Sequence, residues 1–140
     1  MYKSILVAVD DSDQSTRAVE AGIELARQSG GSIHLFHVRE RQDVIGKGGG
    51  SFDNEYKEEA EALVAKYSTQ VGSAGVVVTT EVSHAQLGHV AQEVIRAADD
   101  NGCDTIVMGS QGRSGIGAIL LGSNAYKVLH LADRPVLIIR

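Results

Sequence analysis

The chain has a single cysteine, Cys103, among its 140 residues. One thiol has no partner within the chain, so an internal disulfide is excluded. Chains without disulfides are typical of reducing compartments, and we therefore expect a cytoplasmic protein. We interpret Cys103 itself as a packing residue of the core.

Clusters of basic residues are also missing. The formal net charge is −5, and the sequence contains no block of lysines and arginines. Because binding to nucleic-acid phosphates relies on such clusters, nucleic acid is a poor partner for this chain. A smaller anionic ligand would have to be held largely by backbone N–H groups and helix N-termini.

Long hydrophobic runs are absent as well. The first apolar run covers only residues 5–9, which is too short for the apolar region of a signal peptide. No later run approaches the roughly 20 residues that a membrane-spanning helix needs. We expect neither export nor insertion into a membrane.

The composition that remains is that of a globular protein, with 43% hydrophobic and 22% charged residues. A chain of this length buries enough surface for one compact core without disulfides or metals. We therefore expect a single domain over residues 1–140.

Predicted strands and helices alternate along the chain. Short apolar runs predict strands at residues 5–9, 32–38, 76–82, 104–108 and 135–139. Helical spacing of apolar residues predicts helices from Ser12 or Asp13 to Gly30, over 56–71, from Val90 to about residue 98, and over 125–132. Residues 39–54 are polar and rich in glycine, and we interpret them as a long loop.

This order predicts an α/β fold, a three-layer arrangement in which an open, parallel, five-stranded sheet carries four helices on its two faces. We expect the Rossmann-like strand order 3-2-1-4-5. Ligands of such sheets bind beyond the carboxyl ends of the strands, where the strand order reverses. The first strand ends at Asp10 and the fourth at Met108 and Gly109. If the reversal falls between these strands, their loops form one crevice.

A glycine pattern follows the fourth strand. Gly109, Gly112, Gly122 and Ser123 form the motif G-x2-G-x9-G-S, which runs from a predicted strand end to a predicted helix start. Glycines at 109 and 112 allow positive φ angles and close approach of backbone amides to phosphate oxygens. Gly122 and Ser123 lie at the N-terminus of the last helix, whose free N–H groups can hold an anion. The pattern predicts a phosphate-binding loop; the alternative is a flexible connection without a ligand.

With these features in these places, the chain resembles the universal stress protein family, in the subgroup that binds ATP. The resemblance covers essentially all 140 residues. It rests on the glycine motif together with the opening strand ending at Asp10, the Gly88-His89-Val90-Ala91 segment, the run from Ile106 to Ser110, and the closing run from Pro135 to Ile139.

The resemblance implies a role for each matching residue. Asp10 would contact the adenosine, at a ribose hydroxyl, and the backbone of Val38 would bind the adenine edge, with Met108 in the same set of contacts. The phosphates would be lined by four residues of the motif and by the backbone N–H of the next residue: Gly109, Gly112, Gly122, Ser123 and Asn124. The implied cofactor is ATP, alone or with Mg²⁺ or Mn²⁺, and no metal ligand is assigned.

Two positions depart from the family pattern. Asp11 stands where glycine usually follows the aspartate, and Asn124 stands where a small apolar residue is usual. The second carboxylate at Asp11 would weaken nucleotide binding or help to recruit a divalent ion. The change at Asn124 matters less, because its implied role is a backbone one.

Several residues have simpler interpretations beside the functional ones. Asp10 could cap the first helix, and Arg113 is equally compatible with a phosphate clamp and with a solvated loop charge. The run around Lys47 lacks the first glycine and the Ser or Thr of a P-loop, and we interpret it as a linker or lid. His34 and His37 lie three apart on one strand and should face opposite sides, which excludes a shared metal site. We expect no ligand role for His84 or His89.

The expected function is that of an ATP-binding, nucleotide-dependent regulatory protein of the stress response. No motif places a general base for attack on the γ-phosphate, so we expect slow turnover or none. The alternatives are a weak ATPase or autophosphorylating enzyme acting through Asp10, Asp11 and Ser123, and a ligand-free module that regulates a transporter or kinase. By the resemblance, the apolar last strand, Val136 to Ile139, would pair with its copy in a homodimer.

Overall fold

The computed structural model describes residues 1–53, 55–111 and 120–140. The elements follow one another along the chain as β1 (Ser4–Ala8), α1 (Asp13–Ser29), β2 (Ser32–Asp43), β3 (Ser51–Asp53), α2 (Lys57–Ser73), β4 (Val78–Gln86), α3 (Val90–Asp100), β5 (Thr105–Gly109), α4 (Ser123–Leu131) and β6 (Val136–Ile139). The four predicted helices and five predicted strands are all present, with boundaries shifted by a few residues.

The principal sheet is parallel and has the order β4-β2-β1-β5-β6. In the chain order of the predicted strands this is 3-2-1-4-5, so the predicted strand order is confirmed. The order reverses between β1 and β5, where Ile5 is paired with Thr105 and Ala8 with Met108. The carboxyl ends of these two strands therefore lie side by side.

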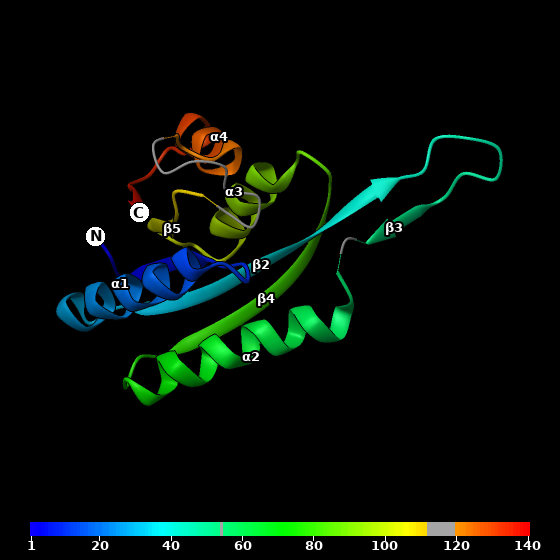
Figure 1. Ribbon diagram of the computed structural model, residues 1–140. Coiled ribbons are helices and arrows are strands. Elements are labelled where there is room, and N and C mark those ends of the chain that lie inside the picture. Colours follow the sequence, from blue (N-terminus) through cyan, green and yellow to red (C-terminus); the bar gives the residue numbers. More distant parts are fainter. Residues whose placement is uncertain (54, 112–119) are drawn as a thin grey trace.

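The interpretation of residues 39–54 as a long loop is wrong. Strand β2 does not end at Val38 but continues to Asp43, and Ser51–Asp53 returns antiparallel to it as β3. The sheet is thus six-stranded and mixed, not purely parallel. Strand β4 runs beside this extension as far as the pair Arg41 and Gln86. Backbone pairing with β4 therefore keeps these polar residues in a strand that their hydrophobicity does not predict. Figure 1 shows the resulting arm of β2 and β3 projecting beyond the helices.

Two helices cover each face of the sheet (Figure 1). Helices α1 and α2 pack on one side through a cluster that includes Val19, Tyr67 and Val107. Helices α3 and α4 pack on the other side through Leu6, Phe36 and their neighbours. Successive strand residues alternate between the two clusters, so that both faces of β1 and β5 are buried, at roughly 1.5–3 kcal/mol for each large side chain. The predicted three-layer architecture is confirmed.

Local signals in the sequence set the ends of α1. Ser12 is the N-cap, and its Oγ accepts a hydrogen bond from the Ser15 N–H at 3.4 Å. Gly30 ends the helix with φ of 67°, in the left-handed region that glycine adopts at low cost. Helix α2 begins at Lys57, and Tyr56, at which the prediction began this helix, is an exposed N-cap residue. In the described part of the chain, none of the helices has the length and apolar character required to span a bilayer.

Candidate functional site

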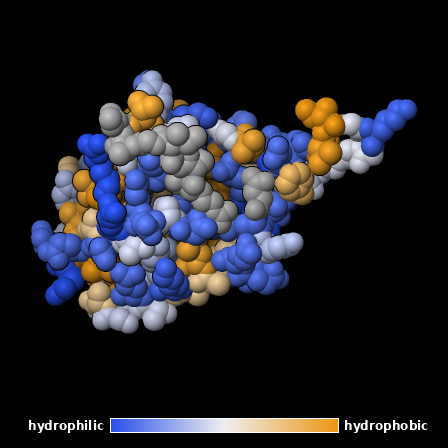
Figure 2. Space-filling model, in the orientation of Figure 1, coloured by the Kyte–Doolittle hydropathy of each residue, from blue (hydrophilic) through white to orange (hydrophobic). Residues whose placement is uncertain are grey.

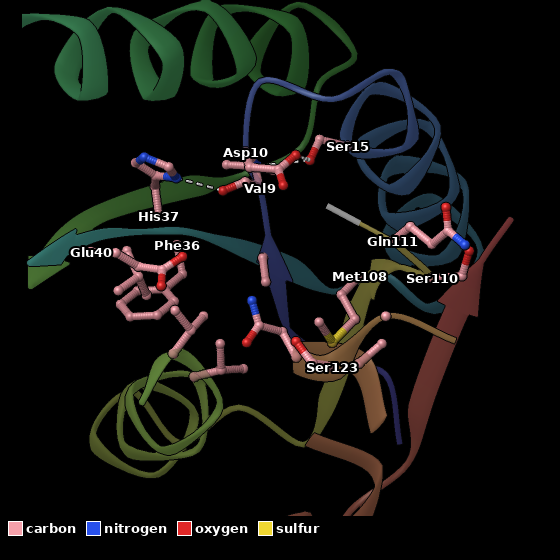
Figure 3. Close-up of a pocket in the computed structure, with 18 of the residues that line it drawn as sticks. Val9, Asp10, Ser15, Phe36, His37, Glu40, Met108, Ser110, Gln111 and Ser123 are labelled. Carbon is pink, nitrogen blue, oxygen red and sulfur yellow. Dashed lines mark hydrogen bonds between the residues drawn. The ribbon is translucent and has the colours of Figure 1, made fainter. Parts of the chain in front are cut away.

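A cavity of about 560 Å³ opens where β1 and β5 end, beside residues 36–40 of β2, the place that the strand order predicts. Its volume lies within the range of small-molecule sites, roughly 300–1,000 Å³. Figure 3 shows side chains from both sheet faces converging on it. Apolar groups of α3 and α4 form one wall, and polar groups at the strand ends and the start of α4 form the other.

Seven of the nine predicted binding residues line this cavity: Asp10, Val38, Met108, Gly109, Gly122, Ser123 and Asn124. They come from four elements that are far apart in the sequence. The other two predicted residues, Gly112 and Arg113, lie outside the described residues. The structure thus brings the predicted set together, and the contact of each residue with a ligand stays a prediction.

Asp10 has a structural task in addition to its place in the cavity. Its Oδ1 accepts hydrogen bonds from the Ser12 N–H at 2.9 Å and from Ser15 Oγ at 2.8 Å. Its own N–H donates to Ser15 Oγ at 2.7 Å. These bonds form the turn into α1, whose N-cap is Ser12 and not Asp10. The same carboxylate lines the cavity, and its contact with a ribose stays a prediction.

The backbone of Val38 lies at a gap in the sheet. The Val9 N–H donates to the Phe36 carbonyl at 2.9 Å, the last step of the β1–β2 ladder, and β1 ends at Ala8. In a parallel ladder alternate residues point their N–H and C=O to the same neighbour, so Val38 points its groups to the side where β1 has ended. Strand β3 pairs with the same edge of β2, but only from Arg41 onward. Between them the backbone N–H and C=O of Val38 face the cavity edge.

Gly109 ends β5 under the side chain of Gln14. A Cβ at Gly109 would lie 2.9 Å from Gln14 Cβ, so close packing requires glycine there. Gly109 does not adopt the positive φ that glycine would allow. Gln14 Oε1 accepts hydrogen bonds from the Gln111 N–H at 2.6 Å and from Ser110 Oγ at 3.2 Å. The start of the glycine-rich segment is therefore fastened to α1.

Gly122 is the N-cap of α4, as predicted for a helix that begins with Ser123. Its N–H donates to the Ser110 carbonyl at 2.6 Å, which joins the two ends of the glycine-rich segment. A Cβ at Gly122 would lie 2.9 Å from that same carbonyl oxygen. The first intrahelical bond of α4 runs from the Tyr126 N–H to the Gly122 carbonyl at 2.9 Å. Among the described residues, no backbone carbonyl accepts from the N–H groups of Ser123 and Asn124, which lie at the cavity where a helix N-terminus attracts anions.

The titratable side chains that line the cavity are mostly acidic. Asp10, Glu40 and Glu55 contribute carboxyl groups, and no lysine or arginine contributes among the described lining residues. Among the described residues, the positive potential available to an anion comes from the backbone amides at the start of α4, in line with the low content of basic residues. Over the described ranges, no group of three or more Asp, Glu, His or Cys side chains has the arrangement of a metal site.

The family model for the universal stress protein family matches residues 1–140. The chain belongs to the universal stress protein family. It is 34% identical to universal stress protein G of Escherichia coli O157:H7 over the full length of both chains. A universal stress protein structure from Burkholderia pseudomallei has a TM-score of 0.77 at 26% identity, covering 99% of this chain and 96% of that one.

Two further structures of the family are nucleotide complexes. A universal stress protein from Archaeoglobus fulgidus in complex with dAMP has a TM-score of 0.71 at 24% identity, over 99% of this chain and 98% of that one. A universal stress protein in complex with cAMP has a TM-score of 0.69 at 23% identity, over 99% of this chain and 97% of that one. At these identities the likeness establishes a shared fold.

Sequence reasoning on this universal stress protein missed three polar residues at or beside the cavity: Gln14, Glu40 and Glu55. Glu40 follows Val38 on the same face of β2, and Figure 3 shows it beside Phe36 at the cavity. Glu55 precedes α2 and contacts His37 Nε2. None of the three belongs to a short motif, because each meets its partners only after the chain has folded.

The histidines lie as predicted on separate faces. His34 Nδ1 is 2.7 Å from Thr79 Oγ1 on the side of α3, whereas His37 Nδ1 is 2.6 Å from the Val9 carbonyl oxygen at the cavity. They cannot share a metal ion. His84 lies on β4 beside Arg39.

An ion-pair network at the root of the arm holds the acidic end of the cavity in place. Arg39 is buried, and its Nη2 donates to Asp53 Oδ2 at 2.8 Å and to the Glu55 carbonyl at 3.0 Å. Burial raises the pKa of Asp53, but the hydrogen bond from Arg41 and the charge of Arg39 outweigh it, so that the pKa lies below its usual range. Asp53 is therefore ionised at neutral pH and joins β3 to β2.

Lys47 lies in the exposed connection between β2 and β3, at the outer end of the arm. It does not line the cavity, which agrees with the rejection of a P-loop. Apolar side chains also lie on the arm, with Val44 and Phe52 half exposed and Ile45 fully exposed. Figure 2 shows this apolar surface clear of the body of the protein.

Proposed function

We propose that this universal stress protein binds an adenine nucleotide, ATP, in the cavity at the ends of β1 and β5, beside the middle of β2. One observation carries the proposal. The gap in the sheet at Val38, the carboxylate of Asp10 and the first turn of α4 all border the same cavity, so that sites for a base, a ribose and an anion are contiguous.

The base end suits adenine. A backbone N–H and C=O from one residue, pointing the same way, match the acceptor N1 and the donor N6 on the edge of adenine. Apolar side chains beside Val38, among them Val90, Val94 and Met108, provide surface for the rings. Asp10 has acceptor capacity for a ribose hydroxyl.

The phosphate end suits an anion that is bound by main-chain donors. Ser123 and Asn124 supply N–H groups at the positive end of the α4 dipole, and Gly122 lines the same end of the cavity. We also propose Gly109, Gly112 and Arg113 as phosphate contacts, with Mg²⁺ or Mn²⁺ as a companion of the nucleotide. The complexes of related structures with dAMP and cAMP support an adenine nucleotide in general.

We propose a regulatory role, in which nucleotide occupancy is signalled to a protein partner in the cytoplasm, with slow hydrolysis or none. The whole chain, residues 1–140, would form one such binding unit. Two outcomes would favour the alternatives. Phosphate release that disappears in an Asp10→Ala variant would indicate a weak ATPase, and ligand-free protein that still binds a partner would indicate an interaction module.

Isothermal titration with ATP tests the proposal. We expect saturable heat with one nucleotide per chain, and a higher melting temperature in the presence of ATP. Native mass spectrometry of gently purified protein should show a copurified adenine nucleotide. If ATP, ADP and AMP all give neither heat nor a shift in melting temperature, the protein is not a nucleotide binder.

A further inference from the structure

The side chain of His37 joins three segments beside the cavity. It is 5% exposed, and its Nδ1 lies 2.6 Å from the Val9 carbonyl oxygen at the end of β1. Its Nε2 contacts Oε1 of Glu55, whose side chain is 7% exposed. Figure 3 shows the ring directed at Val9, next to Asp10. The imidazole thus connects β1, β2 and the segment that precedes α2.

These contacts lie between the two residues that we assign to the nucleoside. Val9 precedes Asp10, and His37 precedes Val38. One more step of the β1–β2 ladder would direct the Val38 N–H to the Val9 carbonyl. The Val9 carbonyl instead accepts a hydrogen bond from the His37 ring, at the point where β1 and β2 separate. By this contact His37 fixes both the end of β1 and the free edge at Val38.

The hydrogen bonds determine how many protons the pair must hold. A carbonyl oxygen only accepts, so Nδ1 carries a proton. An ionised Glu55 also only accepts, so Nε2 must then carry a proton too, and the ring is an imidazolium. If the ring is neutral, Glu55 must be protonated and donate to Nε2. Both arrangements hold one proton more than a neutral histidine beside a carboxylate.

Removal of that proton breaks the link. The lone pair of Nε2 would then face a carboxylate, two acceptors in contact with no hydrogen between them. The surrounding charges offer limited compensation. The titratable and charged groups around the pair come from the turn after β1 (Asp10), β2 (Arg39, with Glu40 on the opposite face of the strand), β3 (Asp53), α2 (Glu59) and β4 (His84). Most are acidic, so an additional negative charge is unfavourable there.

We propose that His37, held by Glu55, is a positioning residue of the nucleoside site, and that the aligned site requires the proton the two side chains share. The inference rests on the proposed function, because its effect is on nucleotide affinity. Affinity should therefore decline as pH rises and the pair loses its proton.

Glu55→Gln provides the decisive variant. A glutamine amide can donate to Nε2 of a neutral ring that keeps its proton on Nδ1, so the link forms without the additional proton. His37→Asn is a second variant, since its amide can donate to the Val9 carbonyl and does not titrate. His84→Gln is the matched control, because it removes a titrating histidine that is outside the cavity lining.

The experiment measures the Kd for ATP of wild type and variants by isothermal titration from about pH 6 to about pH 8.5. The titration of ATP itself cancels when each variant is compared with wild type at the same pH. We expect the ratio of the wild-type Kd to the Glu55→Gln Kd to rise about tenfold over this pH range. The ratio of the wild-type Kd to the His37→Asn Kd should rise in the same way. The ratio of the wild-type Kd to the His84→Gln Kd should not change with pH.

A flat ratio against Glu55→Gln, with ATP bound normally by a folded wild type and variant, would overturn the inference and leave the proposed function standing. If the increase of Kd with pH disappears in His84→Gln, the inference is overturned as well. If wild type binds no ATP at any pH, the proposed function itself fails. Thermal melting of each variant at each pH establishes that only folded protein is compared.

Discussion

At the scale of single residues, Gln14 fastens the start of the glycine-rich segment to α1. Its Oε1 accepts from the Gln111 N–H and from Ser110 Oγ, and its side chain packs on Gly109. The backbone that follows β5 is thereby fixed before it reaches the N-terminus of α4. A neutral acceptor at this position suits a neighbouring phosphate site.

Gln14→Glu tests this placement with an isosteric change. A carboxylate still accepts from the Gln111 N–H, so stability should change little. Its charge should repel a triphosphate, and we expect affinity for ATP to fall about tenfold while affinity for adenosine is retained. Gln28→Glu, at the far end of α1, adds the same charge and should leave both affinities unchanged. Equal losses for ATP and adenosine would contradict the placement of the phosphates.

Substitutions at Asp10 separate its two tasks. Asparagine keeps an Oδ1 that accepts from Ser12 and Ser15, but its amide nitrogen cannot accept from a ribose hydroxyl. We expect Asp10→Asn to weaken ATP binding about tenfold with little change in the free energy of unfolding. Asp10→Ala should lose affinity and also about 1–2 kcal/mol of stability. Calorimetric binding and chemical denaturation measure the two effects, and full affinity in Asp10→Asn would exclude a contact in which the carboxylate accepts from a ribose hydroxyl.

Among the predicted site residues, those inside the glycine motif could be found because the motif fixes their spacing. His37, Glu55 and Gln14 could not be assigned their roles in this way. The partner of His37 lies 18 residues away and that of Gln14 lies 97 residues away, across strands whose pairing the local pattern does not specify. Only the folded chain shows which acceptor faces which donor.

At the scale of elements, apolar periodicity was sufficient for the buried strands and failed at the arm. Strands β1 and β5 are covered on both faces and form continuous apolar runs. Residues 39–43 of β2 are polar, and backbone pairing with β3 and β4 keeps them extended. The glycines at 46 and 48–50 suggested a loop, although they form the turn between two paired strands.

The pairing of β1 with β5 depends on an acidic anchor at the beginning of β5. Asp104 Oδ2 accepts from the Lys3 N–H at 2.9 Å, and its Oδ1 accepts from Thr105 Oγ1 at 2.9 Å. Burial raises the pKa of Asp104, but these hydrogen bonds outweigh it, and the pKa lies below its usual range. The carboxylate is therefore stabilised in the folded state relative to the unfolded one.

A carboxyl group with a lowered folded-state pKa contributes stability above its unfolded pKa, near 3.9, and loses this contribution as pH falls through the folded pKa. We expect Asp104→Ala to reduce the free energy of unfolding by about 1 kcal/mol at neutral pH. The difference from wild type should shrink below about pH 4. Urea denaturation across this range measures it, and a constant difference down to about pH 2 would contradict the anchor.

At the scale of the whole molecule, β6 leaves one edge of the sheet open to a second copy. It is an outermost strand, and Leu137 is 41% exposed on it. The carbonyls of Pro135 and Ile139 accept from β5, so the alternation directs the N–H and C=O of Val136 and Ile138 to the free edge. We propose that this strand, Val136–Ile139, pairs with its copy in a homodimer.

Leu137→Lys tests the dimer. A charge on the exposed face of an edge strand opposes pairing with a second strand, so we expect wild type to be dimeric and the variant monomeric. Val77→Lys, before the strand at the opposite edge of the sheet, is the matched control and should remain dimeric. Light scattering coupled to size exclusion gives the masses. A monomeric wild type at micromolar concentration would contradict the proposal.

The binding of a nucleotide phosphate by the start of α4 and the glycine-rich segment is the central claim, and Gly122→Val tests it most directly. The added Cβ would lie 2.9 Å from the Ser110 carbonyl oxygen, where the two ends of the segment meet, whereas Gly50→Val adds the same side chain to the arm, where nothing lies within 4 Å. Isothermal titration with ATP should give equal affinity for wild type and Gly50→Val and no measurable heat for folded Gly122→Val. Wild-type affinity in Gly122→Val would contradict the account.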